Sequence, residues 1–116
     1  MSDIVLDLPV PPSVNRSRRL DRAELKKSLA WQSAADSYAL SQKVCRRKIA
    51  GRYEAIIVLD PEHAAGDLDN RIKALLDYAV RINLVADDSK KYLQRLTVEW
   101  GTAPFGCRLT LRAITA

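Results

Sequence analysis

The sequence predicts an α+β fold in which two helices pack on a mixed sheet of roughly four strands, in the order βαβαββ. Three observations support this prediction: several short runs have apolar residues at alternate positions, two longer stretches have helical character, and proline or glycine separates many of these segments. A chain of 116 residues suffices for one domain, so we expect residues 1–116 to fold as a single unit.

The first strand and the first helix are predicted in the amino-terminal half. Isoleucine or leucine occupies every second position over residues 4–8, and the proline-rich segment 9–12 ends the strand because proline cannot continue a ladder. Asp21 and Glu24 have the spacing of a capping box, and the residues that follow them lack glycine and proline. We therefore expect one long helix that ends near Ile49.

The remaining elements are predicted from periodicity. Residues 53–59 are apolar on most of both faces, which indicates a strand in the centre of its sheet. Apolar residues recur with helical spacing over residues 68–82. Two further alternating runs, at 96–100 and 107–111, predict two strands joined through residues 101–106.

Composition argues against several classes of protein. There is no long apolar stretch, signal peptide or lipidation motif, so we expect a soluble protein without a membrane partner. Cys45 and Cys107 stand alone, which fits neither a disulfide framework nor a zinc site. We expect both to be reduced and to pack as small apolar groups.

Negative charge is concentrated in one segment of a basic chain. The net charge is +5, yet residues 60–88 carry seven acids against three bases, a net of −4, and the rest of the chain sums to +9. Grouped carboxylates repel, so a fold tolerates them mainly when they are solvated, paired or bound to a cation. A polyanionic partner would explain the positive charge of most of the chain, and a divalent ion would explain the concentration of acids in residues 60–88. The acids are Asp60, Glu62, Asp67, Asp69, Asp77, Asp87 and Asp88.

Part of this segment has the pattern of a metal site. Mg²⁺ and Mn²⁺ need only two or three carboxylates from separate elements, and Asp67, Asp69 and Asp88 supply that number. Lys73, one turn beyond Asp69, places a cation within reach of a bound phosphate, and Asn70 could orient a ligand. Such a set could hydrolyse a phosphodiester.

The same residues also have a purely structural interpretation. An Asp-x-Asp-Asn segment at a helix start is a common N-cap. Asp69 and Lys73 have the spacing of an ordinary i,i+4 pair worth ~0.3 kcal/mol, and residues 87–89 form a common polar turn. From the residues alone, both interpretations remain open.

In these segments the chain resembles the RusA family of Holliday junction resolvases, which are metal-dependent endonucleases of bacteria and their prophages. Residues 8–16 look like the opening strand and proline-rich turn of that family. Residues 66–77 carry its Asp-Leu-Asp-Asn segment with the downstream lysine, and residues 84–88 its Asp-Asp pair. Order and spacing agree over about 80 residues.

The resemblance implies a RusA-like fold and assigns roles. Asp67, Asp69 and Asp88 would be the catalytic, metal-binding carboxylates, Lys73 the catalytic lysine and Asp87 a supporting neighbour. The implied activity is resolution of four-way junctions in DNA recombination and repair, by paired phosphodiester hydrolysis with Mg²⁺, for which Mn²⁺ can substitute. The implied protein is a homodimer in the cytoplasm, encoded by a bacterium or prophage.

DNA contacts are expected from two basic runs. The family carries a basic run before its Asp-Leu-Asp-Asn segment, whereas residues 61–66 here are neutral to acidic, so selectivity for four-way junctions over flap or other branched DNA stays open. The alternatives are a non-catalytic branched-DNA-binding module and a phosphohydrolase for small nucleotides. The first run comprises Arg16, Arg18, Arg19, Arg22, Lys26 and Lys27, and the second Lys43, Arg46, Arg47, Lys48 and Arg52; Asn15, next to the first run, is a further expected DNA contact.

Overall fold

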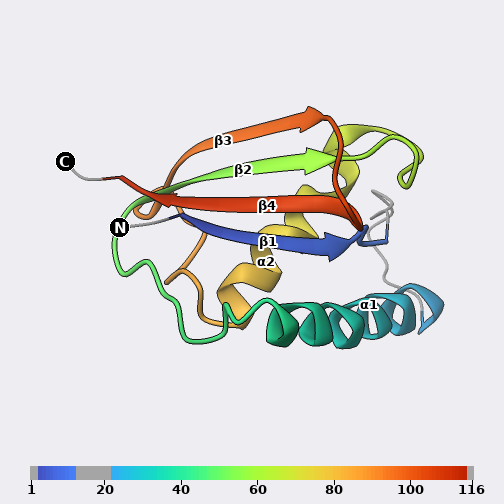
Figure 1. The fold of residues 1–116 in the computed structure, drawn as a ribbon, viewed down its shortest axis with the longest axis horizontal. Coiled ribbons are helices and arrows are strands. Elements are labelled where there is room, and N and C mark those ends of the chain that lie inside the picture. Colours follow the sequence, from blue (N-terminus) through green and yellow to red (C-terminus); the bar gives the residue numbers. More distant parts are fainter. Residues whose placement is uncertain (1–2, 13–21, 115–116) are drawn as a thin grey trace.

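The observed elements follow the predicted order. The computed structural model describes residues 3–12 and 22–114, as four strands, two α-helices and one short 3₁₀ helix (Figure 1). The α+β class and the order βαβαββ are thereby confirmed. The elements are β1 (Ile4–Pro9), α1 (Arg22–Ser41), β2 (Tyr53–Leu59), η1 (Leu68–Arg71), α2 (Ile72–Arg81), β3 (Leu93–Trp100) and β4 (Gly106–Ala113).

The four strands form one mixed sheet in the order β1-β4-β2-β3. β4 is antiparallel to both of its neighbours, whereas β2 and β3 are parallel. β2 therefore lies inside the sheet, as its apolar sequence predicted. β3 and β4 follow each other in the chain but are not neighbours, because β4 inserts between β1 and β2 and leaves β3 at one edge.

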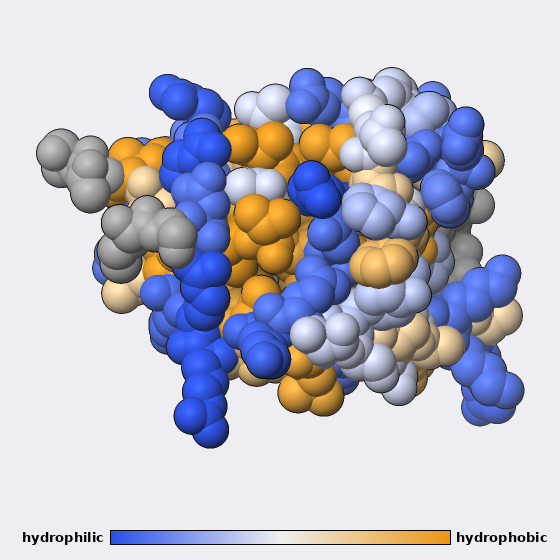
Figure 2. Space-filling view, in the orientation of Figure 1, coloured by the Kyte–Doolittle hydropathy of each residue, from blue (hydrophilic) through white to orange (hydrophobic). Residues whose placement is uncertain are grey.

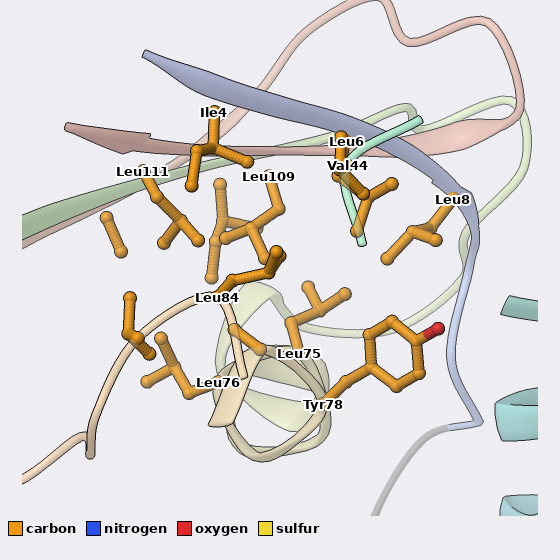
Figure 3. Packing of buried hydrophobic residues seen from close by; sticks show 14 of the residues in the cluster. Ile4, Leu6, Leu8, Val44, Leu75, Leu76, Tyr78, Leu84, Leu109 and Leu111 are labelled. Atoms are coloured by element: carbon orange, nitrogen blue, oxygen red, sulfur yellow. The ribbon is translucent and has the colours of Figure 1, made fainter. Parts of the chain in front are cut away.

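The core lies between the sheet and α2. The side chains of Leu75, Leu76 and Tyr78 on α2 point toward apolar side chains from the strands, among them Leu109 and Leu111 (Figure 3). Leu75, Leu109 and Leu111 are fully buried. At about 25 cal/mol per Å² of apolar surface removed from water, this layer is the main source of stability.

The first helix packs along the β1 side of the sheet (Figure 1). Side chains from this helix and from the residue after it bond the outer edge of β1. The side-chain amide of Gln42, just beyond the helix, exchanges two hydrogen bonds with the Asp7 backbone, at 2.8 and 2.7 Å. Trp31 donates from Nε1 to the Pro9 carbonyl at 2.8 Å. These bonds occupy polar groups that would otherwise offer an open edge to another strand.

The first helix is shorter than predicted, because it ends at Ser41 and not near Ile49. Lys43 adopts the left-handed conformation, with φ of 60°, and the Val44 N–H donates to the Ala39 carbonyl across the turn. This is a helix-ending turn, and it directs the Val44 side chain into the core. The predicted N-cap Asp21 lies outside the described residues.

The second helix also begins later than predicted. Leu68–Arg71 is a 3₁₀ turn, and the α-helix starts only at Ile72. Within the described residues, no helix is both long and apolar enough to cross a membrane.

The two cysteines are free thiols in different surroundings. Cys107 is buried in β4, as predicted for a small apolar group, whereas Cys45 is exposed just after the turn that ends α1. The packing prediction is therefore wrong for Cys45. Burial raises the pKa of the Cys107 thiol to about 12, so it stays protonated at neutral pH.

Candidate acidic site

Lys73 brings the two predicted acidic segments together. Asp67 immediately precedes η1 and Asp69 lies within it, whereas Asp87 and Asp88 follow α2. Lys73, in the first turn of α2, places its Nζ atom 2.9 Å from an Asp88 carboxylate oxygen. The start of the helix and the Asp-Asp segment are thus joined by a direct ion pair, between residues that the sequence had grouped.

The environment of Lys73 keeps it charged. Asp77 lies 3.1 Å from the same ammonium group, so two carboxylates share one lysine. The hydrogen bonds that Lys73 donates to Asp88 and then to Asp77 raise its pKa above the ordinary value. The Lys73 side chain is 69% exposed and that of Asp88 only 20%, so the carboxylate is held in place while the cation faces solvent.

The side chain of Asp67 does not cap the helix that follows it. Its backbone is extended, it occupies the N-cap position of η1, and its side chain makes no capping hydrogen bond. The N-cap of α2 is Arg71, which likewise makes none. The capping interpretation is therefore wrong for Asp67, whose carboxylate is exposed. Asp69 is also exposed, and the backbone of Asn70 lies in η1.

The predicted three-carboxylate cluster is not assembled in this structure. Among the described residues, no three Asp, Glu, His or Cys side chains form a group that could hold a metal ion. Asp67, Asp69 and Asp88 fit Mg²⁺ in the kind of atom they offer, since hard cations take oxygen ligands and keep several waters. In this structure Asp88 forms an ion pair with Lys73 instead of joining a three-carboxylate group.

Tyr53 holds the Asp-Asp segment against the sheet, a role that sequence reasoning missed. Its side chain is fully buried, and its hydroxyl donates to the Asp87 carbonyl at 3.0 Å. Burial, followed by the charges of Asp88 and Asp87, raises the pKa of Tyr53 to about 12, so it remains a donor at neutral pH. In the sequence it was only the first residue of an apolar strand.

Arg71 fixes the loop before Asp67, and sequence reasoning counted it only as a charge. Its guanidinium donates to the Pro11 carbonyl and, at 2.7 Å, to the Ala65 carbonyl. Its Nε is buried without a hydrogen-bond partner among the described residues. The side chain thus ties the proline-rich turn after β1 to the acidic segment, which explains why the two predicted motifs adjoin.

Asp60 belongs to the scaffold. It is 7% exposed and accepts hydrogen bonds from the backbone N–H groups of Glu62 and Ala103, at 3.0 and 3.1 Å. These backbone bonds lower the pKa of its carboxyl group. The carboxylate of one of the seven acids therefore has its hydrogen bonds supplied by the loops that follow β2 and precede β4.

Several basic side chains remain available around the fold. Lys26 and Lys27 are exposed on α1, whereas Arg47 donates to the Asp3 carbonyl at 2.9 Å. Lys90 and Lys91, which the predicted basic runs omitted, are exposed directly after the Asp-Asp segment. The predicted contacts Asn15, Arg16, Arg18 and Arg19 lie outside the described residues, and Arg22, Lys43, Arg46, Lys48 and Arg52 are exposed.

The uncovered face of the sheet is balanced in charge. Figure 2 shows hydrophobic surface over the strands, crossed by rows of hydrophilic groups. Arg112 lies 3.0 Å from Asp3 and 3.3 Å from Glu54, and Arg108 lies 2.7 Å from Asp7. Because Arg108 and Arg112 are paired with carboxylates, these two arginines offer this face little unpaired positive charge for a phosphate backbone.

Comparison of the chain with models of known protein families gave no match, and comparison with curated proteins gave none either.

Proposed function

We propose that the protein is a metal-dependent, structure-selective DNA endonuclease that resolves four-way junctions in recombination and repair. The observation that supports this best is the contact between Lys73 and Asp88. It joins the two segments of the pattern that resembles the RusA family, although they are 15 residues apart in sequence and lie on different elements.

In this proposal Asp67, Asp69 and Asp88 would hold Mg²⁺ or Mn²⁺. Such an ion polarises a phosphoryl oxygen and lowers the pKa of a bound water. Lys73 stays protonated because its carboxylate partners raise its pKa, so it can offset negative charge on a phosphate. Tyr53 and Arg71 would position the two acidic segments through the Asp87 and Ala65 carbonyls.

A second candidate is a branched-DNA-binding module without catalysis. It is favoured by a specific observation, namely that the described side chains form no three-ligand cluster and that Asp88 is neutralised by Lys73. In that case the acids serve to hold the α2–β3 connection, and the basic side chains account for DNA affinity.

Cleavage of an end-labelled four-way junction tests the proposal, beside matched linear duplex and flap DNA, in Mg²⁺, Mn²⁺ or EDTA. The structure supplies a matched pair of variants, because Asp88 and Asp77 both contact Lys73. Asp88→Asn should abolish cleavage and keep junction binding, whereas Asp77→Asn should still cut.

The outcomes separate the candidates. Symmetric, metal-dependent nicks on the junction alone would support a resolvase, and cutting of flaps as well would support a broader branched-DNA nuclease. Tight junction binding without any cutting, in every metal, would move the assignment to the binding module. Full cleavage by Asp88→Asn would remove that carboxylate from the site.

A further inference from the structure

The ammonium group of Lys73 is shared between two carboxylates that differ in exposure. Its Nζ atom lies 2.9 Å from an Asp88 oxygen and 3.1 Å from an Asp77 oxygen. The side chain of Asp88 is 20% exposed and that of Asp77 is 59% exposed. Asp77 lies one turn beyond Lys73 on α2, whereas Asp88 lies beyond the end of that helix. The lysine therefore contacts one local partner and one distant partner at the same time.

Of these groups, the ammonium is the one that can move at little cost. Asp88 is positioned by its own segment, because the fully buried Tyr53 donates to the carbonyl of the preceding residue, Asp87, at 3.0 Å. Lys73 is 69% exposed, and its charge is carried on a long flexible stem. A rearrangement of this ion pair would therefore move the lysine and leave the carboxylate in place.

The contact also limits what else Asp88 can bind. An ammonium ion in contact with a carboxylate repels a second cation that approaches the same group. Little of the Asp88 side chain is open to solvent, so the carboxylate offers few other directions of approach. Lys73 therefore lowers the affinity of Asp88 for any further cation.

We infer that Lys73 competes with a divalent cation for Asp88 and moves onto Asp77 alone when that cation binds. Asp77 already contacts the ammonium, so Lys73 keeps one carboxylate partner after it leaves Asp88. The pair that remains has the i,i+4 spacing that stabilises helices. The inference rests on the proposed function, because it takes Asp88 to be a ligand of the cation.

The same exchange would couple the cation to DNA in the proposed nuclease. A backbone phosphate is a second anion that can accept Lys73 and so release Asp88. The phosphate and the cation would then each favour the binding of the other. The ion pair would thereby keep the affinity for the cation low until DNA is bound.

Mn²⁺ binding to the full chain without DNA tests the competition, because electron paramagnetic resonance measures free Mn²⁺ directly. Lys73→Met keeps the length of the side chain and removes its charge, so it should bind Mn²⁺ roughly three- to tenfold more tightly than the wild type. Lys73→Arg keeps the competing charge and should bind no more tightly than the wild type. Circular dichroism checks that each variant is folded.

Lys90→Met is the control for net charge. It removes the same charge from an exposed lysine two residues beyond Asp88, and Lys90 makes no ion pair with the described residues. Because a solvated charge is screened, this variant should change the Mn²⁺ affinity by less than about twofold. Equal tightening by Lys90→Met and Lys73→Met would reduce the effect to net charge and overturn the competition.

Asp77→Asn tests the move onto the second carboxylate. It removes the group that receives the ammonium, so it should weaken Mn²⁺ binding by roughly two- to fivefold, a loss that a higher metal concentration overcomes. Combined with Lys73→Met, the same change should cost less, because no ammonium is left to receive. An equal loss in both backgrounds would overturn the transfer to Asp77.

Two further results separate this inference from the proposed function. Equal Mn²⁺ affinities of the wild type and Lys73→Met would overturn the competition and leave the nuclease proposal standing. No binding of Mn²⁺ at millimolar concentration by either protein would overturn both, because Asp88 would then not be a metal ligand.

Discussion

Replacing Tyr53 with phenylalanine isolates one hydrogen bond at the candidate site. The ring fills a fully buried position and would remain, so the variant loses only the bond from the hydroxyl to the Asp87 carbonyl at 3.0 Å. A neutral hydrogen bond contributes a net of roughly 0.5–1.5 kcal/mol, and Asp87 is an exposed residue. We therefore expect the free energy of unfolding to fall by about 1 kcal/mol.

Urea denaturation followed by circular dichroism measures this loss. Tyr92→Phe is the matched control, because Tyr92 is half-buried and its hydroxyl makes no hydrogen bond with the described residues. This control variant should change the free energy of unfolding by less than about 0.5 kcal/mol. The alkaline absorbance titration of the wild type should show one tyrosine with a pKa of about 12 that is absent from the variant. Equal stability of Tyr53→Phe and wild type would refute the view that this bond holds the Asp-Asp segment.

Three further predictions concern the scaffold and can be checked by the same denaturation assay. Gln42→Ala should lower the free energy of unfolding by about 1–2 kcal/mol, because two hydrogen bonds to the β1 edge are lost. The control is Gln32→Ala, which should have little effect because Gln32 is half-buried and makes no hydrogen bond to the described residues. Leu109→Ala should lower it by about 3 kcal/mol, because the side chain is fully buried in an inner strand; a loss below about 1 kcal/mol would contradict the observed core. Hydrogen bonds from Arg81 and then Tyr78 lower the pKa of Asp36, so that carboxylate stabilises the fold above its unfolded pKa of about 3.8. The stability difference between wild type and Asp36→Asn should therefore be present at neutral pH and shrink as the pH falls below that value, and a difference that grows on acidification would contradict the assignment.

The fold was predictable because its strands carry strong local signals. The segment that became β2 is apolar on most of both faces, and in the sheet its residues alternate between buried and partly buried, with none fully exposed. The alternation within β1 and β4 likewise matches their burial. The position of β3 was not predictable, since no local pattern states which strand lies beside which.

The predicted end of the first helix was wrong for a different reason. No glycine or proline marks the end of α1 at Ser41, and the turn at Lys43 is imposed by Val44 entering the core and by Gln42 bonding β1. Such long-range contacts override local propensity, and they are invisible in a short window of sequence.

The candidate site was predictable as a set of charges but not as a geometry. Spacing paired Lys73 with Asp69, and the structure shows that Lys73 also contacts Asp77, four residues further along the helix. The residues that orient the segments were missed, because Tyr53 has the pattern of a core residue and Arg71 that of a surface charge. Both act through backbone carbonyls of other residues, which leave no trace in the sequence.

The charge balance around Lys73 bears on the choice between the two candidate functions. Residues 60–88 carry a net charge of −4, and of the acids described, Asp60 is satisfied by backbone N–H groups while Asp77 and Asp88 share one lysine. Asp67 neither caps η1 nor is buried, so the scaffold gives no structural reason for a carboxylate at this position. A carboxylate that the fold does not use is available to a cation or a substrate. The nuclease proposal assigns it that role, whereas the binding module must place an acid beside DNA at an electrostatic cost.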